Sequence, residues 1–283
     1  MKRSLLPVLV SLLAVCAVQA DPAAERLMHA TFKVFNAAST GTGFLLRDTA
    51  PDAARTQVVL VTAKHAFERA KGDHVLLVCR VKDATNRWQR LDHKVMIREG
   101  KRDLWTGHPT QDIAVLCCTL PTNAVFEALP VEALASEARA RASGLSIGSP
   151  LFYCCFPHRI EANSAAFPLF RTGTVSGYPL FPADHYPVVL FSGATFAGDS
   201  GAPVAVATPD AELPLAVIGL IVTRTQHKNH ITSEDVTLTL KSDINLGSFV
   251  HAAYILECLD RMRAEPAAQQ SHHEDAKVKK ASF

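Results

Sequence analysis

Short apolar, β-branched segments separated by turn residues dominate the hydrophobic pattern of this chain. In the first half these segments are residues 28–46, 56–62, 74–81, 88–97 and 112–120. In the second half they are residues 150–156, 170–177, 185–192, 202–207, 216–223 and 236–241. Runs of this kind, bounded by Gly, Pro, Ser and Asn, predict β-strands. Residues 112–120 are apolar on both faces, which indicates a buried strand.

One segment near the C-terminus has a helical period instead. Residues 247–263 place Phe249, Ile255 and Leu259, among others, near helical spacing, which predicts an α-helix. Residues 126–147 are rich in Ala, Glu and Pro and predict a connector between two halves. The polar composition of residues 264–283 predicts a flexible tail.

The two sets of strands predict an all-β fold. We expect two six-stranded antiparallel β-barrels, one in residues 21–125 and one in residues 148–263, with a C-terminal α-helix completing the second unit. Closing a sheet into a barrel removes its exposed edges, which is one common solution for a chain of many short strands.

The first twenty residues have the composition of a signal peptide. Lys2 and Arg3 precede an apolar run from Leu5 to Ala17, and Val18-Gln19-Ala20 fits the small-x-small cleavage pattern. The sequence therefore predicts an exported protein, periplasmic or secreted. Two alternatives stay open at this point, namely a buried N-terminal helix and a lipid anchor on Cys16.

Charge and composition narrow the class of partner. The 283 residues carry 29 Lys+Arg and 27 Asp+Glu, and removing Lys2 and Arg3 leaves 27 of each sign, a net charge of zero. A neutral chain with no basic run argues against a nucleic-acid partner. The sequence after residue 20 contains no second long apolar segment, so we expect no stable insertion in a membrane. A charged share of 20% is typical of a globular protein.

Six cysteines follow the predicted signal peptide, and an oxidising compartment would allow them to pair. They are Cys79, Cys117, Cys118, Cys154, Cys155 and Cys258. The sequence does not choose among the possible pairings, and burial as free thiols is the alternative. The adjacent pairs 117–118 and 154–155 lie on predicted strands, so the two side chains of each pair should point to opposite faces.

Three short motifs carry candidate chemistry. His65 ends the motif T-A-K-H after a predicted strand, Asp112 begins the motif D-I-A-V-L before another, and Ser200 lies in G-D-S-G-A-P before a third. Each alone has an ordinary structural interpretation, as a surface His, a capping Asp or a turn. Their order and strand contexts together favour catalysis. Asp103 is an alternative acid, but no buried strand follows it.

These motifs resemble the T-A-x-H, D-I-A-x-L and G-D-S-G-x-P signatures of the trypsin-like (chymotrypsin-fold) serine proteases, over roughly residues 28–263. Residues 41–45 and 148–176 are more similar to bacterial Deg-type members. The resemblance implies that Ser200 is the nucleophile, His65 its base and Asp112 the orienting acid. The backbone N–H groups of Gly198 and Ser200 would form the oxyanion hole. A protein or peptide substrate, and no metal or organic cofactor, is implied.

The resemblance also implies a primary substrate pocket. Ala194 would lie at its base, where members that cut after basic residues carry Asp, with Thr195, Ile221, Val222 and Thr223 along it. Ile221 stands where glutamate-specific members need a His. We therefore expect a preference for small or medium apolar side chains at P1, the substrate residue before the scissile bond.

The chain departs from the family in several places. Cleavage after residue 20 would leave Asp21-Pro22, without the Ile/Val-Val-Gly-Gly start that supplies an ion-pair partner to the residue matching Asp199. Ala66 and Phe196 stand where digestive members have bridging cysteines, so the standard disulfides are not expected. The residues after 263 are too few for a PDZ domain. The oligomeric state is left open.

Two other classes of function remain as alternatives. One is a catalytically silent, protease-like domain that binds proteins. The other is an α/β-hydrolase esterase, whose chain order of Ser, acid and His differs from the order found here. His227 and His230 in an H-x-x-H spacing, and His272 and His273, lack accompanying ligands, so we expect solvated segments and no metal site.

Overall fold

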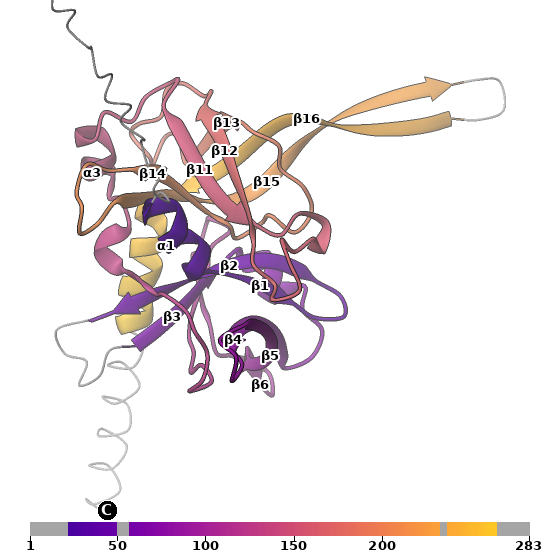
Figure 1. The fold of residues 1–283 in the computed structure, drawn as a ribbon. Coiled ribbons are helices and arrows are strands. Elements are labelled where there is room, and N and C mark those ends of the chain that lie inside the picture. The colour runs from indigo at the N-terminus through magenta and orange to yellow at the C-terminus, as the bar shows by residue number, and fades with distance from the viewer. Residues whose placement is uncertain (1–21, 50–56, 233–236, 265–283) are drawn as a thin grey trace, which may run out of the picture.

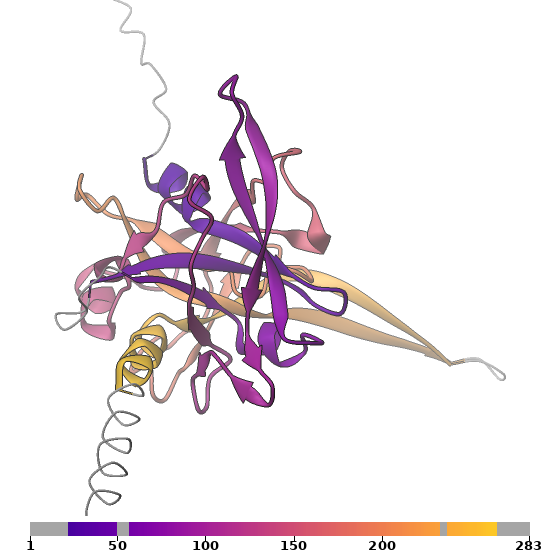
Figure 2. The same cartoon turned by 90° about the horizontal axis from the view of Figure 1, so that it is seen from below.

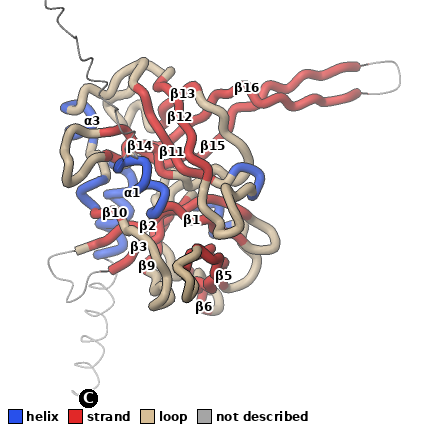
Figure 3. Tube along the Cα trace, viewed as in Figure 1, coloured by secondary structure: helices blue, strands red, loops and turns tan. Residues whose placement is uncertain are grey.

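The computed structural model describes residues 22–49, 57–232 and 237–264, and strands make up most of its regular structure (Figures 1 and 3). The predicted signal peptide, residues 1–20, and all but the first residue of the predicted tail lie outside these described residues. Within them, no helix has the length and apolar character needed to span a membrane.

The N-terminal half is built on one sheet with the order β5-β4-β1-β2-β3-β9-β8, and β10 pairs with β2. The elements are α1 Pro22–Ala30, β1 Thr31–Phe35, β2 Thr40–Asp48, β3 Gln57–Thr62, α2 Lys64–Glu68, β4 His74–Lys82, β5 Trp88–Met96, β6 Arg98–Glu99, β7 Arg102–Asp103, β8 Thr106–Gly107, β9 Ala114–Cys117 and β10 Leu129–Pro130. Strands β6 and β7 form a separate small pair. Strands β5 and β8 stand at the two ends of this order and do not pair with each other in the described residues. The sheet is therefore not closed there, and the predicted first six-stranded barrel is not confirmed.

The predicted strand over residues 28–46 is wrong in its first part and interrupted later. Residues up to Ala30 form α1, whose buried positions Ala23, Leu27 and Ala30 follow helical spacing. The remainder is a hairpin of β1 and β2, because the Asn36 side chain accepts hydrogen bonds from the N–H groups of Ala38 and Ser39 at 2.9 and 2.8 Å. This local turn competes with a continuous strand.

The C-terminal half contains the closed six-stranded barrel that the sequence predicted, in the order β11-β12-β13-β16-β15-β14. Its elements are β11 Pro150–Cys155, η2 Pro157–Arg159, β12 Leu169–Val175, β13 Val188–Ser192, β14 Pro203–Ala207, β15 Leu215–Thr232 and β16 Thr237–His251. The connector before it holds η1 Val131–Ala133 and α3 Glu137–Ala142. The Ser136 side chain caps α3 by accepting from Arg139 N at 3.2 Å.

The C-terminal helix is present but starts later than predicted. It spans residues 253–264 (Figure 2). Residues 247–251 belong to β16, and residues 246–250 pair with β13. Gly247 fits this strand because a Cβ there would collide with the Phe191 ring. The helix packs Ile255 and Leu259 into a buried cluster that includes Phe44 and Val61 of the N-terminal half, so this cluster joins the two halves into one body.

Strands β15 and β16 extend far beyond the predicted segments. Strand β15 pairs with β14 only over Leu215–Leu220, and β16 pairs with β13 only over residues 246–250. Beyond the barrel the two strands pair with each other to Thr232 and Thr237 and project from the body as a two-stranded ribbon (Figures 1 and 2). We call residues 223–232 and 237–245 the arm.

The six cysteines that follow residue 20 all lie among the described residues and form no disulfide there. The prediction of opposite faces is confirmed for Cys154, which packs in the cluster between the halves, and Cys155, which packs inside the barrel. It is also confirmed for Cys118, which packs under the N-terminal sheet, while Cys117 contacts Met262 of the C-terminal helix.

Candidate active site

Strand pairing brings His65 and Asp112 together. Antiparallel pairing of β3 and β9 sets Thr62 opposite Ala114, so the end of β3 lies beside the start of β9. His65 follows β3 in the short helix α2, and Asp112 precedes β9. The buried, β-branched strand β3 therefore fixes the position of the histidine, and its partner β9 fixes that of the acid.

The carboxylate of Asp112 contacts His65 at two points. Asp112 Oδ2 lies 2.6 Å from His65 Nδ1, and Asp112 Oδ1 accepts the His65 backbone N–H at 2.9 Å. Burial acts to raise the pKa of Asp112, but the hydrogen bonds and charge of His65 outweigh burial and hold this pKa below its usual value. An ionised carboxylate at this position favours the tautomer with the proton on Nδ1 and leaves Nε2 able to accept a proton.

Ser200 lies in a turn that only glycine can make at two positions. Gly198 and Gly201 have φ of 103° and 91°, and a Cβ on either would collide with backbone oxygen, of Phe156 and Thr42 respectively. Thr42, in β2 of the N-terminal half, donates its N–H to the Ser200 carbonyl at 2.8 Å and its hydroxyl to the Gly198 carbonyl at 2.7 Å. The turn is thus held by the opposite half of the molecule.

This arrangement leaves two backbone donors without partners. Among the described residues, the N–H groups of Gly198 and Ser200 donate to no acceptor. The Ser200 hydroxyl donates to the Val222 carbonyl over a long 3.5 Å. Two neighbouring donors held by a rigid turn beside a hydroxyl are suited to stabilise an oxyanion that forms on a group bound there.

The predicted catalytic residues meet in one cleft of about 370 Å³ between the halves. Its lining consists of Thr40, His65, Arg69, Asp112, Phe196, Ala197, Gly198, Ser200, Ile221 and Val222. Four of these lining residues were not predicted from the sequence to bind substrate, namely Thr40, Arg69, Phe196 and Ala197. Arg69 is the C-cap residue of α2, one helical turn after His65, so the two side chains lie on the same face.

The predicted pocket residues divide into three groups. Ile221 and Val222 line the cleft. Ala194 and Thr195 do not lie on this lining: the Ala194 carbonyl accepts from the Tyr153 hydroxyl at 2.8 Å, and Thr195 is buried. The side chain of Thr223 lies outside the described part of the chain. The apolar wall of the cleft is therefore made by Phe196, Ile221 and Val222.

Asp199 is buried beneath the turn of residues 198–201 that holds Ser200, which we call the nucleophile turn after its predicted role. Its Oδ2 accepts the Phe196 N–H at 2.7 Å, while its Oδ1 has no hydrogen-bond partner among the described residues. Burial raises the pKa of Asp199 to about 6, against the opposing effects of that hydrogen bond and of the Arg171 charge. Arg171 pairs with Tyr153 across β12 and β11, and its guanidinium lies 5.0 Å from the Phe196 ring centre. The positive charge near Asp199 thus comes from within the barrel.

The raised pKa makes stability depend on pH. The folded chain binds the Asp199 proton more tightly than the unfolded chain, so this stabilising contribution is full below about pH 4 and is lost as pH rises through about 6. We expect wild type to lose about 3 kcal/mol of unfolding free energy relative to Asp199→Asn between these limits. Urea unfolding of both proteins from pH 4 to 7 measures the difference, and parallel pH profiles would contradict it.

Gly198→Ala tests the oxyanion donors. A Cβ at this position collides with the Phe156 carbonyl oxygen and the residue holds φ of 103°, so the substitution must rotate the turn. We expect any turnover at Ser200 to fall about 10²- to 10³-fold, the effect of losing one oxyanion donor. Gly144→Ala is the control, since Gly144 also has a positive φ but has no atom near its Cβ position. Equal kcat in both variants would exclude the assigned role.

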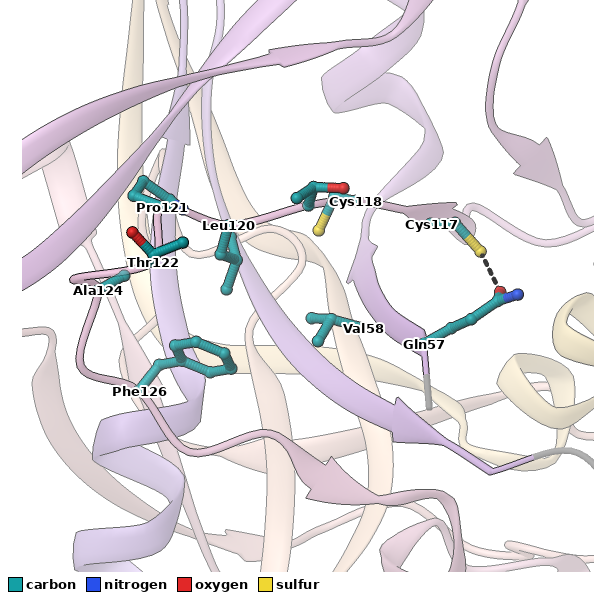
Figure 4. Close-up of a pocket in the computed structure, with 10 residues that line it drawn as sticks. Gln57, Val58, Cys117, Cys118, Leu120, Pro121, Thr122, Ala124 and Phe126 are labelled. Carbon is teal, nitrogen blue, oxygen red and sulfur yellow. Dashed lines mark hydrogen bonds between the residues drawn. The ribbon is translucent and has the colours of Figure 1, made fainter. Parts of the chain in front are cut away.

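A larger groove of about 620 Å³ lies elsewhere, on the N-terminal half (Figure 4). Gln57, Cys117, Cys118, Leu120 and Phe126 are among its lining residues, and Cys117 Sγ lies 3.0 Å from Gln57 Oε1. Burial raises the pKa of Cys117 and raises that of Cys118 to about 12, so both thiols stay protonated at neutral pH. The lining residues of this groove include no carboxylate and no histidine, so the groove itself offers no acid-base pair.

The remaining sequence candidates lie apart from the cleft or outside the description. Asp103 forms an ion pair with Arg98 at 3.0 Å and does not line the cleft. The side chains of His227 and His230, and the whole of His272 and His273, are not among the described residues. In the part of the chain that the structure describes, no group of three or more His, Cys, Asp or Glu residues could hold a metal ion.

No protein-family model matches the chain, and no match was found among curated proteins. Among solved structures it is similar to the inactive form of a serine-to-alanine mutant of Rv3671c from M. tuberculosis H37Rv. Sequence identity is 15% and the TM-score is 0.47, over 86% of this chain and 91% of that one. The inactive form of the Rv3671c protease gives 15% and 0.46, over 85% and 92%.

Proposed function

We propose that this protein is a serine endopeptidase that hydrolyses peptide bonds through an acyl-enzyme intermediate. The observation that carries the proposal is the convergence of the His65–Asp112 pair, the Ser200 hydroxyl and two unpartnered backbone N–H groups on one cleft. These are the three components of acyl transfer by a serine nucleophile, namely a base held by an acid, a nucleophile and an oxyanion site.

The residues act in sequence. His65 Nε2 accepts the proton of the Ser200 hydroxyl as Oγ bonds to the substrate carbonyl carbon, and the Gly198 and Ser200 N–H groups bind the resulting oxyanion. Asp112 stabilises the imidazolium through Nδ1. His65 then delivers the proton to the leaving amine, which breaks the peptide bond and leaves an ester on Ser200. Water, deprotonated by His65, hydrolyses this ester and restores the hydroxyl.

The substrate preference follows from the walls of the cleft. Phe196, Ile221 and Val222 are apolar, and Ala194 supplies no charge to the turn that leads into it. A P1 side chain on this wall contacts three apolar residues, and desolvation of a basic or acidic P1 group there would cost binding energy. We therefore infer a preference for small or medium apolar P1 residues, which profiling with a peptide library would measure. A profile dominated by Arg or Glu would contradict it.

The site would operate outside the cytoplasm, in the periplasm or the medium. This part of the proposal rests on residues 1–20, whose basic start, apolar run and small-x-small end fit a signal peptide. Expression of the full chain, followed by mass determination of the exported product, would give a new N-terminus at Asp21. A product that retains Lys2 and Arg3 would contradict export by cleavage.

Covalent labelling tests the activity most directly. A fluorophosphonate probe phosphonylates a serine that a neighbouring base activates, and Ser200 should be the labelled residue at neutral pH by peptide mass mapping. Heat-unfolded protein is the control, because it retains the serine but loses the site. If this chain were a protease-like domain that only binds proteins, the folded protein would stay unlabelled. That result would reject the proposal that it is an enzyme.

A further inference from the structure

One edge of β15 has no paired strand, in the described residues, from the position beside Ser200 to the end of the arm. The nucleophile turn occupies this edge up to Ile221, since Gly201 N donates to the Ile221 carbonyl at 2.7 Å and Ile221 N donates to Ala202 at 2.9 Å. The next carbonyl, of Val222, accepts the Ser200 hydroxyl. Beyond it, the pairings of the described residues leave residues 223–232 joined only to β16, on the other side.

The backbone of the arm can form hydrogen bonds with a further strand. Neither 223–232 nor 237–245 contains proline, so every residue has a backbone N–H to donate. A two-stranded ribbon has two open edges and is marginally stable in water, and a third strand would satisfy one edge. In the strand pairings of the described residues, β16 has no strand other than β15 beside it beyond β13, but only the β15 edge begins at the cleft.

We propose that the β15 edge of the arm binds substrate as an added antiparallel strand, so that the enzyme acts on extended, unfolded polypeptides held over about ten residues before the scissile bond. The inference rests on the proposed function, because Ser200 sets the register. The barrel strands all pair antiparallel. With the scissile carbonyl at Ser200, antiparallel pairing directs the N-terminal part of the substrate outward along the arm.

An added strand of this kind is recognised through the backbone of the substrate. Hydrogen bonds between paired strands alternate, so every second substrate residue exchanges bonds with β15 while the others face away. Affinity then depends on substrate length and on freedom from existing secondary structure, and only weakly on sequence beyond P1. Folded proteins would present few segments of this length, and unfolded chains would present many.

The test compares peptide lengths in two proteins. One substrate carries three residues before the scissile bond and another carries ten, with the same P1 and leaving group. The shortened variant joins Gln226 to Asp243, which pair directly, through a two-residue Asn-Gly turn in place of residues 227–242. We expect wild type to cleave the long peptide with at least about tenfold higher kcat/KM, the shortened variant to lose this advantage, and the short peptide to be cleaved equally by both.

N-methylated peptides give a second measurement that needs no variant. Methylation of one backbone nitrogen removes a donor, so alternate positions from the fourth residue outward should lower kcat/KM and the intervening positions should not. A uniform effect of methylation, or equal cleavage of long and short peptides by wild type, would overturn the proposal while leaving the endopeptidase intact. An advantage for peptides lengthened after the scissile bond would also overturn it.

A binding measurement tests the proposed role of the β15 edge independently of the proposed peptidase activity. If wild type cleaves neither peptide, the proposed function is wrong. Fluorescence anisotropy of the long peptide with Ser200→Ala then still shows whether the peptide binds along the β15 edge. Binding that requires residues 227–242 supports it, and no binding overturns it. If removal of those residues changes only the sedimentation of the protein, the arm pairs with a second copy of this chain, and the substrate proposal is wrong.

Discussion

Ser200→Ala is expected to lower kcat for peptide hydrolysis by about 10⁶-fold, the effect of removing a serine nucleophile whose other catalytic groups remain. The residual rate comes from the oxyanion donors and from substrate binding. Stability should change little, because the hydroxyl makes only the 3.5 Å contact with the Val222 carbonyl. The Ser200 carbonyl, which accepts from Thr42 N at 2.8 Å, is backbone and is retained.

Kinetics of a long peptide substrate and thermal unfolding should be measured on the same samples. Ser164→Ala is the matched control, since Ser164 is exposed in a loop outside the cleft, and it should keep wild-type kcat. Substantial hydrolysis by Ser200→Ala, with the same cleavage site and no contaminating protease, would remove this serine from the reaction.

Asp112→Asn is expected to lower kcat by about 10⁴-fold without unfolding the protein. The contacts of Asp112 explain the direction. The His65 backbone N–H donates to Oδ1, so an asparagine would place its carbonyl oxygen there and turn its NH₂ group toward Nδ1. A donor facing Nδ1 stabilises the tautomer with the proton on Nε2, and that nitrogen can then no longer accept the Ser200 proton.

Two measurements distinguish this tautomer effect from a general distortion. Nitrogen NMR of the labelled imidazole should show the proton moving from Nδ1 to Nε2 in Asp112→Asn, and fluorophosphonate labelling should slow in proportion to kcat. Asp103→Asn is the control acid: it forms a surface pair with Arg98, and its substitution should leave kcat unchanged. Unchanged tautomers with a normal rate in Asp112→Asn would show that this carboxylate does not orient His65.

The sequence predicted the residues of the candidate site better than the elements around it. Short motifs mark His65, Asp112 and Ser200, and the structure brings these three residues to one cleft. The helix boundary was missed because Phe249 and Val250 fit both a helical and a strand pattern. Pairing of β16 with β13 decides between the two, and such long-range pairing overrides local periodicity.

The arm could not be predicted for a different reason. Residues 223–232 show no alternation of apolar and polar positions, which is the pattern that predicts a strand with one buried face. The first barrel was predicted from the number of strands alone, but closure depends on pairing between the end strands. The sequence pattern does not specify that pairing.

The hydrogen bonds of Thr42 have a consequence for how the protein can be inactivated. This one residue of the N-terminal half holds the carbonyls on both sides of Asp199 in the C-terminal half, and His65 and Asp112 come from the same side of the cleft as Thr42. The proposed reaction therefore requires the docked halves, because neither half alone holds His65, Asp112 and Ser200. Under that proposal, any agent that loosens the contact between the halves should abolish turnover, even where the barrel itself stays folded.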